Sequence, residues 1–198
     1  MTVKTLALAL AACLFATPLL AWAPTPATQK VLRSGQAWAE VLPDADGAAL
    51  IRSAVDIAAP PATVWAVMTD CRLASRFISD LASCTVLQGD QRRGWDVRDQ
   101  FSHGNLFLPD IHNVVRSVYQ PYSLIRFQKA GGNLKIEDGE WRLEALDGGA
   151  GTRVIYINRV KADILVPAPL VRASLRGSTP KVLMALRRES LAAAARSL

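Results

Sequence analysis

Apolar and polar residues alternate at every second position in several parts of the chain, which is typical of strands with one buried face. Residues 50–57 give the clearest case, because Ile51, Val55 and Ile57 alternate there with charged residues such as Arg52. A pair of prolines follows this segment. The pattern therefore predicts a half-buried strand that stops before the prolines.

A helix is expected directly after this strand. Pro60 and Pro61 cannot donate a hydrogen bond to a sheet, and Pro61 has the fixed φ angle of a first helical residue. Val64, Val67 and Met68 then recur at helical spacing and form an apolar face. The change from a period of two to a helical period predicts a strand followed by a helix.

The chain up to residue 160 continues mainly as strands separated by turn-forming residues. After a second short helix over residues 73–78, the further strands are expected at 36–42, 82–87, 95–102, 111–119, 123–129, 140–146 and 152–160. Residues 24–33 have no clear period and are expected to be a mobile lead-in, and residues 130–133 to be a flexible link. Consecutive strands joined by hairpins predict an antiparallel sheet.

The C-terminal part of the chain is expected to be helical. Residues 170–176 can form one or two turns, and Thr179 suits an N-cap with Pro180 at the first position of a helix that runs to about Arg196. The alternative is one long helix with a kink at Pro180. In both cases the apolar side carries Val182, Leu183, Leu186, Ser190 and Ala193.

Five segments occur in an order that resembles a known superfamily: VDIAAPPATVWAVMTD, FISDLASCTVL, GEWRLEAL, GTRVIYINRV and VPAPLVRASLRGSTPKVLMALRRE. Across roughly residues 48–192 the chain resembles the START-like (SRPBCC) superfamily, most closely its coenzyme Q-binding START and polyketide cyclase/dehydrase branch. The resemblance implies an α+β helix-grip fold, with a curved antiparallel sheet of about six to seven strands around a long C-terminal helix and an apolar cavity between them. It implies no fixed catalytic residue, because the superfamily mixes carriers with enzymes.

Residue parity predicts which side chains line this cavity. Trp141 shares one side of its strand with Leu143, opposite three charged residues, so this side should face inward. On the next strand the side that bears arginines should lie outside, which turns Tyr156 and Asn158 inward toward a quinone or lipid carbonyl. The expected lining is Trp95, Phe101, Phe127, Trp141, Tyr156 and Asn158, with Leu183 and Leu186 on the opposite wall. The alternative is that these side chains simply fill a core.

A charged pair is also expected on the inner face. Asp99 shares a strand face with Trp95 and Phe101, and Arg116 shares one with Val114 on the following strand. An antiparallel register would bring Asp99 near Arg116, where the pair could orient the polar group of a ligand. The alternatives are a register in which both residues face water, or a purely structural pair.

Residues 1–23 have the pattern of a secretory signal peptide, since one lysine precedes an apolar run that ends in small residues. Cleavage is expected after Ala21 or Ala23, which leaves residues 24–198 as a single START-like domain. The expected location is therefore outside the inner membrane, in the periplasm. A membrane anchor, or a lipoprotein acylated at Cys13, are the alternatives.

The remaining cysteines are Cys71 and Cys84. An exported protein meets an oxidising compartment, so an even pair predicts a disulfide bond. The alternative is two small buried thiols. A metal site is not expected, because no histidine lies near these cysteines.

The positive charge is concentrated at one end of the chain, which has a formal net charge of +6. Only Asp163 and Glu189 oppose the basic residues of the segment 159–198, which are Arg159, Lys161, Arg172, Arg176, Lys181, Arg187, Arg188 and Arg196. Such a segment could contact an anionic membrane peripherally. The alternative is a solvated helix face. Nucleic acid is not an expected partner, because the segment lacks interleaved aromatic residues.

Motifs of catalysis are missing from the sequence, which has no nucleophile elbow, zinc-protease motif or phosphate-binding glycine loop. His103 with Asp110 or Asp99 could form a base and its orienting carboxylate. The interpretation favoured for His103 and His112 is that of loop histidines at the protein surface. No cofactor and no metal are expected.

Three classes of function are consistent with these observations. The leading hypothesis is an exported binding or carrier protein for a hydrophobic small molecule, such as a lipid or an isoprenoid quinone. The second is an enzyme of the polyketide cyclase/dehydrase kind, and the third is a structural or interaction module with a filled cavity. A carrier needs only an apolar lining and an orienting group, and the sequence supplies these more clearly than a catalytic set.

Overall fold

The computed structural model describes residues 22–104, 109–163 and 166–196 of the 198-residue chain. The strands are β1 (Trp38–Pro43), β2 (Ala49–Ile57), β3 (Leu81–Asp90), β4 (Trp95–Ser102), β5 (Ile111–Gln120), β6 (Leu124–Gly132), β7 (Leu134–Leu146) and β8 (Gly151–Ala162). The α-helices are α1 (Pro26–Arg33), α2 (Pro61–Thr69), α3 (Ala74–Phe77) and α4 (Ala168–Arg196). Single 3-10 turns, η1 (Ala45–Gly47), η2 (Gln91–Arg93) and η3 (Asp147–Gly149), connect strands.

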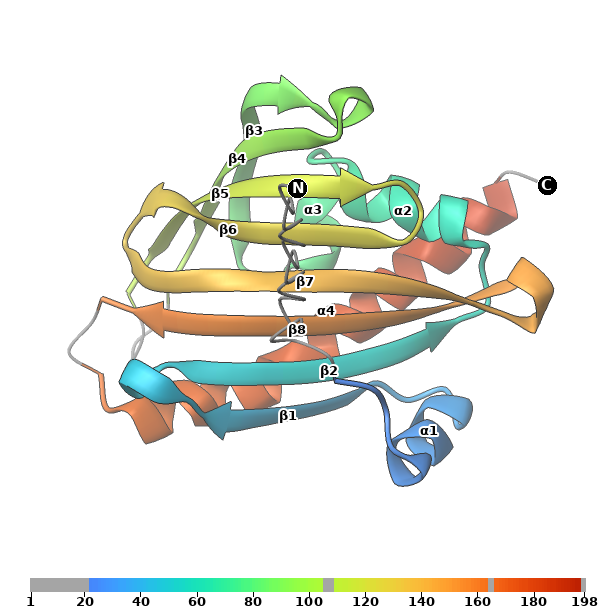
Figure 1. Ribbon diagram of the computed structural model, residues 1–198, viewed down its shortest axis with the longest axis horizontal. Coiled ribbons are helices and arrows are strands. Elements are labelled where there is room, and N and C mark those ends of the chain that lie inside the picture. The colour runs from blue at the N-terminus through green and yellow to red at the C-terminus, as the bar shows by residue number, and fades with distance from the viewer. Residues whose placement is uncertain (1–21, 105–108, 164–165, 197–198) are drawn as a thin grey trace, which may run out of the picture.

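All eight strands form one antiparallel sheet in the order β1-β2-β8-β7-β6-β5-β4-β3. Helix α4 crosses behind this sheet, and α2 and α3 lie beside one end of it (Figure 1). We call the face of the sheet that packs on α2, α3 and α4 the inner face, and the opposite one the outer face. The expected α+β helix-grip fold is confirmed, with eight strands instead of six to seven.

The predicted signal peptide lies outside the described residues, apart from Trp22 and Ala23. Trp22 stacks on Trp38 of β1 with ring centroids 5.2 Å apart. No helix in the part of the chain that the structure describes has the length and apolarity required to cross a membrane.

Helix α2 forms as the prolines predict, with Pro60 at its N-cap and Pro61 in its first turn. Its buried side chains, which include Val64 and Met68, join the main core with the fully buried Leu183 and Leu186 of α4. Because these groups pack against the inner face, α2 and α4 together enclose the space over the middle of the sheet.

Residues 24–33 are not a mobile lead-in, because Pro26–Arg33 form helix α1. The Oγ1 atom of Thr25 accepts a hydrogen bond from the backbone N–H of Thr28 at 3.2 Å, which caps the helix. Leu32 then packs on Ile155 and Ile157 of β8. As the sequence predicts, these two isoleucines lie on the outer face of the sheet. They are nevertheless buried, because α1 covers them.

The expected flexible link at residues 130–133 is part of a long β6–β7 hairpin. Gly132 has a φ angle of 84°, and a Cβ atom there would lie 2.1 Å from the carbonyl oxygen of His112, so the close turn requires glycine. Strand β7 consequently begins at Leu134 and includes Glu137. A register shift between Leu134 and Ile136 interrupts the alternation there, which is why the sequence pattern did not predict this part of the strand.

The C-terminal segment is one helix, α4, that contains Pro180. Proline has no N–H to donate to the carbonyl of Arg176, four residues earlier, and the Oγ1 of the neighbouring Thr179 donates to the carbonyl of Leu175 at 2.7 Å. Of the two interpretations from the sequence, the structure therefore has the continuous helix.

A disulfide bond joins Cys71 and Cys84, as the cysteine count predicts. Their Cα atoms are 5.4 Å apart. Cys71 follows α2 and Cys84 belongs to β3, the last strand of the sheet. The bond therefore fastens the α2–α3 segment to the edge of the sheet.

Candidate functional site

A cavity of about 340 Å³ lies between the inner face and α4. Its walls come mainly from β4, β5, β7, β8 and α4. The lining residues are Ile51, Ile78, Leu81, Gln100, Ser102, Ile111, Asn113, Leu134, Glu137, Trp141, Tyr156, Asn158, Val160, Ala162, Val171, Ser174, Leu175, Ser178, Thr179, Val182 and Leu183. This volume is at the lower end of the range found for small-molecule sites, and a mainly apolar wall with a few polar groups is typical of them.

A smaller compartment of about 150 Å³ adjoins this cavity and shares Ile78, Gln100, Asn113, Glu137, Trp141 and Tyr156 with it. Its other lining residues are Met68, Thr69, Ala74, Phe77, Arg98, Val115, Ser117, Tyr119, Ile125 and Phe127. The shared residues stand where the two compartments meet. A larger share of the wall of the smaller compartment is polar, so the space as a whole has an apolar part and a polar end.

Three aromatic rings stack along the inner face. The ring centroids of Trp141 and Tyr156 are 4.0 Å apart, and those of Tyr156 and Phe127 are 6.1 Å apart. Gly139 makes room for this arrangement, since a Cβ atom there would lie 2.7 Å from the ring of Phe127. The stack fixes the Tyr156 ring, and with it the position of the hydroxyl group.

A buried carboxyl group, that of Glu137, lies at the junction of the compartments. The Nδ2 of Asn158 donates to Glu137 Oε1 at 3.1 Å and to the Tyr156 hydroxyl oxygen at 2.7 Å. Burial raises the pKa of Glu137 to about 8, although the hydrogen bond from Asn158 opposes this shift. Burial also raises the pKa of Tyr156, so its hydroxyl stays protonated at neutral pH.

A second polar group, formed by Asp96, Arg98 and Tyr119, lies beside the smaller compartment. Arg98 Nε donates to Asp96 Oδ2 at 2.9 Å, and its Nη2 donates to the Thr69 carbonyl at 2.7 Å. The Tyr119 hydroxyl donates to Asp96 Oδ1 at 2.7 Å. The side chains of Asp96 and Arg98 are only 1% and 8% exposed, so this ion pair is fully desolvated and compensates its own charge.

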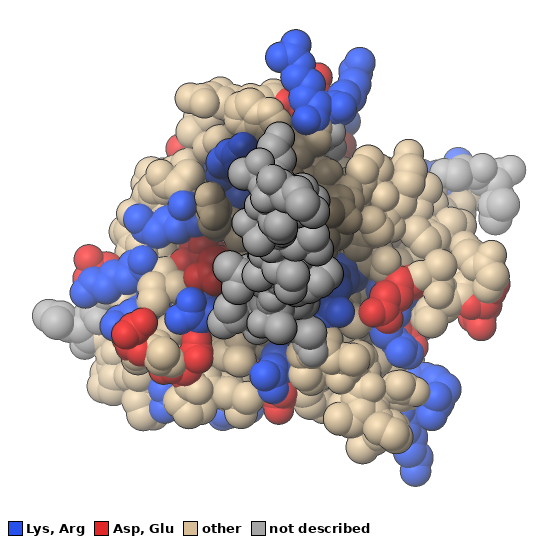
Figure 2. Space-filling view, viewed as in Figure 1, with Lys and Arg blue, Asp and Glu red and all other residues tan. Residues whose placement is uncertain are grey.

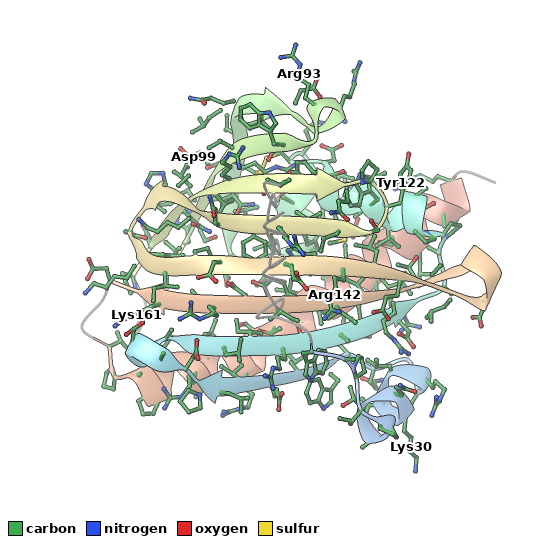
Figure 3. All side chains as sticks on the ribbon, viewed as in Figure 1. Lys30, Arg93, Asp99, Tyr122, Arg142 and Lys161 are labelled. Carbon is green, nitrogen blue, oxygen red and sulfur yellow. A yellow bond between two sulfur atoms is a disulfide. The ribbon has the colours of Figure 1, made fainter. Side chains whose placement is uncertain are left out.

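Four predicted site residues, Trp95, Asp99, Phe101 and Arg116, do not line the cavity. They lie on the outer face (Figure 3 labels Asp99). The inner positions of β4 are instead polar and include Arg98, Gln100 and Ser102. The prediction that the apolar side of β4 faces inward was therefore wrong. The inward side of this strand is polar because it forms the polar end of the cavity.

The expected pair between Asp99 and Arg116 is also wrong. In the observed register Asp99 is opposite Val114, and Arg116 is opposite Val97. Asp99 Oδ1 lies 2.8 Å from Nε2 of His112, and the guanidinium of Arg116 lies 5.3 Å from the Trp95 ring centre. Neither charged group can orient a ligand inside the cavity.

The other predicted residues lie at or near the cavity. Trp141, Tyr156, Asn158 and Leu183 line the larger compartment, and Phe127 lines the smaller one. Leu186 is fully buried in the adjoining core. Their role in binding a ligand stays a prediction.

Sequence reasoning missed Glu137, Arg98, Gln100 and Asn113. The one signal available for Glu137 was the composition of the segment 134–139, in which charged residues occur at both parities. Such a composition is typical of a loop, and it fits a strand only when the register shift between Leu134 and Ile136 is taken into account. The inward direction of the β4 side chains follows only from the pairing of β4 with β5.

His103, the alternative candidate for a catalytic base, is not in the cavity wall. His103 Nδ1 lies 3.9 Å from Asp110 Oδ1, and their side chains are 70% and 57% exposed. In the described ranges of the chain, no group of three or more His, Cys, Asp and Glu side chains could hold a metal ion.

Several basic residues of α4 have structural contacts. Arg176 and Arg187 donate to the backbone carbonyls of Val41 and Gly35, at 3.1 and 2.9 Å. Arg188 donates to the Arg76 carbonyl at 3.4 Å. On the opposite side of the molecule, Lys and Arg side chains intermingle with Asp and Glu over the outer face (Figure 2). These three arginines hold α4 against β1, the segment between α1 and β1, and α3, and are not simply a free basic surface.

Comparison with solved structures places the fold among lipid-transfer and cyclase structures. An aromatase/cyclase, Zhui from a Streptomyces species, is 18% identical, with a TM-score of 0.61 over 72% of this chain and 93% of that one. The STAR-related lipid transfer protein from Xanthomonas axonopodis is 16% identical, with a TM-score of 0.62 over 77% and 98%. Human STARD10 is 12% identical, with a TM-score of 0.63 over 86% and 81%. At these identities the likeness concerns the fold alone.

Comparison of the sequence itself identifies the family. No curated protein matches the chain. Residues 57–187 match the family model described as polyketide cyclase / dehydrase and lipid transport. This match spans more than half of the chain and runs from Ile57, the last residue of β2, through most of α4. The chain therefore belongs to the polyketide cyclase / dehydrase and lipid transport family.

Proposed function

We propose that this protein is an exported binding or carrier protein that holds a hydrophobic small molecule between the inner face and α4. The observation that carries the proposal is the cavity of about 340 Å³ with its mainly apolar wall. A fully packed core would leave few voids larger than a water molecule. Transfer of apolar ligand surface from water into this space supplies the driving force for binding.

The volume limits the size of the ligand. A cavity of about 340 Å³ is at the lower end of the range of small-molecule sites, which suits a ligand of the size of a single acyl or isoprenoid chain or of two or three fused rings.

An enzyme of the cyclase/dehydrase kind is the second candidate function. One observation favours it, which is the buried Glu137 carboxyl group beside the Tyr156 hydroxyl. A carboxyl group with a pKa near the working pH suits general acid catalysis. The third class, a module with a filled cavity, is disfavoured by the volume of the cavity.

Export remains part of the proposal and rests on residues 1–23, together with the disulfide bond that an oxidising compartment would permit. The proposed location is the periplasm. A peripheral contact with an anionic membrane is proposed for the basic residues of α4 that have no structural contact.

Blocking the cavity tests the proposal. Ser178 of α4 lines the cavity, whereas Ala192 of the same helix is exposed. In a titration with the apolar fluorescent dye N-phenyl-1-naphthylamine, the wild type and Ala192→Phe should bind the dye, and Ser178→Phe should bind at least about tenfold more weakly. Equal binding by Ser178→Phe and Ala192→Phe, or no binding by the wild type, would refute the cavity as the ligand site.

A further inference from the structure

We propose that Glu137 and Tyr156 act together as two hydroxyl donors that bind a single carbonyl or enol oxygen of the ligand. This inference rests on the proposed binding function and narrows its ligand class. The ligand would be an apolar molecule with a conjugated carbonyl group at one end.

The geometry of Asn158 carries the inference. Its Nδ2 donates to both Glu137 Oε1 and the Tyr156 hydroxyl oxygen, at 3.1 and 2.7 Å. Each oxygen atom therefore accepts a hydrogen bond from Asn158. The Tyr156 hydroxyl proton is left free to be donated, and no described residue accepts it. Because one nitrogen contacts both groups, the Tyr156 hydroxyl and the Glu137 carboxyl group lie side by side in the wall.

The surroundings of Glu137 keep its carboxyl group neutral. Among the residues that line the two compartments within the described ranges, Arg98 is the one cation, and it is bound to Asp96 and the Thr69 carbonyl. The wall residues of α4 are uncharged, and so are those of β6, β7 and β8 apart from Glu137 itself, among them Phe127, Trp141, Tyr156 and Asn158. The neighbouring Asp138 carboxylate also raises the pKa of Glu137. An unpaired carboxyl group in such a site prefers its protonated form.

A neutral carboxyl group is a hydrogen-bond donor as well as an acceptor. With the pKa of Glu137 raised to about 8 by burial, most molecules carry this proton at pH 7. Oε1 already accepts from Asn158, so the proton is available on Oε2. A carboxylic acid that an apolar site keeps neutral beside a tyrosine hydroxyl is a known arrangement for stabilising a carbonyl oxygen.

The position of the two donors fits an amphipathic ligand. Glu137 and Tyr156 line both compartments, so a ligand oxygen held at their junction leaves the apolar body in the larger space. The Tyr156 ring is stacked at 4.0 Å on Trp141, which holds its hydroxyl in place before the ligand arrives. Such preorganisation lowers the entropic cost of binding.

A pair of shape-matched probes tests the inference. In 2-acetylnaphthalene a carbonyl group takes the place of the terminal C=CH₂ group of 2-isopropenylnaphthalene, and neither molecule titrates. Kd is measured for both by calorimetry at pH 6.5, and the ratio of the olefin Kd to the ketone Kd reports the carbonyl contact. The double variant Glu137→Met/Tyr156→Phe should lower this ratio by about tenfold or more, since two hydrogen bonds are lost.

Three further measurements separate this role from a structural one. Glu137→Gln keeps an N–H donor and should retain most of the ratio. In the wild type the ratio should fall as the pH rises through about 8, whereas in Glu137→Gln it should stay constant. Tyr122→Phe, in which the altered side chain is exposed, is the matched control and should behave as the wild type.

The outcomes distinguish this inference from the proposed function. If both probes bind the wild type and the double variant leaves the ratio unchanged, the donors are used within the protein and the inference is wrong, while the cavity remains a ligand site. If neither probe binds the wild type, the proposed function itself fails.

Discussion

Glu137 and Asn158 meet on the inner face of the sheet through one hydrogen bond of 3.1 Å, from the amide Nδ2 to the carboxyl Oε1. Asn158 is 3% exposed and Glu137 is 9% exposed. Placing a carboxyl group in an apolar wall without a cation beside it costs free energy, because water no longer solvates its charge. A protein that needed only a packed core would gain stability from an apolar residue at this position, so the pair points to a role in the cavity.

Replacing Glu137 by Gln should stabilise the protein above pH 5. The pKa of Glu137 is raised from its ordinary value of 4.5 to about 8, so the folded state holds a proton that the unfolded state has already lost. The stability of the wild type is therefore fully present below pH 4.5 and decreases as the pH rises toward 8. The advantage of Glu137→Gln should grow by about 1.4 kcal/mol per pH unit across this interval.

Urea unfolding of both proteins between pH 4 and pH 9 measures this difference. Other titrating groups are common to the two proteins and cancel in the comparison. A constant difference across the whole range would mean that Glu137 keeps an ordinary pKa in the folded protein.

The disulfide bond should contribute substantially to stability. Cys71 and Cys84 are separated by 13 positions, and closing a loop of this length is worth about 3 kcal/mol in the chain-entropy model. The double variant Cys71→Ser/Cys84→Ser should lose about this amount of unfolding free energy, and the wild type under reducing conditions should match it. Thiol labelling of the unreduced protein gives the control, and two reactive thiols there would contradict the bond.

The contact between α4 and the core should be energetically important. Leu186 is fully buried, and Leu186→Ala should lower the free energy of unfolding by about 2–5 kcal/mol. Leu170 lies on the same helix and is 52% exposed, so Leu170→Ala should change it by less than about 0.5 kcal/mol. Similar effects of the two substitutions in thermal or urea unfolding would show that α4 does not pack as described.

Membrane contact, if it is electrostatic, should depend on the basic residues of α4 that are free of structural contacts. Arg172, Lys181 and Arg196 make no hydrogen bond or ion pair within the described part of the chain. Replacing these three by Gln should weaken binding to vesicles that contain anionic lipid, and added salt should weaken the binding of the wild type.

A triple variant of Lys30, Arg92 and Arg93 to Gln removes the same charge from α1 and η2 and serves as the matched control (Figure 3 labels Lys30 and Arg93). Equal loss of binding in both triple variants would show that only the net charge matters. Binding to neutral vesicles that is independent of salt would exclude an electrostatic contact.

The sequence was sufficient to predict the order of the strands and of α2, α3 and α4, although not α1, and much of the inner face. Pro60 and Pro61 predicted the boundary between β2 and α2, because proline is confined to few positions in either element. The charged side of β7 predicted that Trp141 points inward, since one strand with two chemically different faces determines its own orientation.

The orientation of β4 could not be derived in the same way. Trp95 and Phe101 gave this strand an apolar side, but the inner side carries Arg98 and Gln100. In β4 the polar side chains face the cavity and the more apolar side of the strand lies on the outer face, which is the opposite of the usual pattern. Only the pairing of β4 with its neighbouring strands shows this orientation. Glu137 was missed for a related reason, because the bulge after Leu134 removes the alternation on which the prediction depended.

The central claim is that the cavity holds a hydrophobic molecule in the native protein, and mass spectrometry under non-denaturing conditions tests it most directly. The protein is purified from the cells that naturally make it, and its mass is compared before and after organic extraction. A bound apolar compound should be present in the wild type and in Ala192→Phe, and should be missing from Ser178→Phe. A wild-type protein that carries no extractable compound and also takes up no apolar probe would contradict the account.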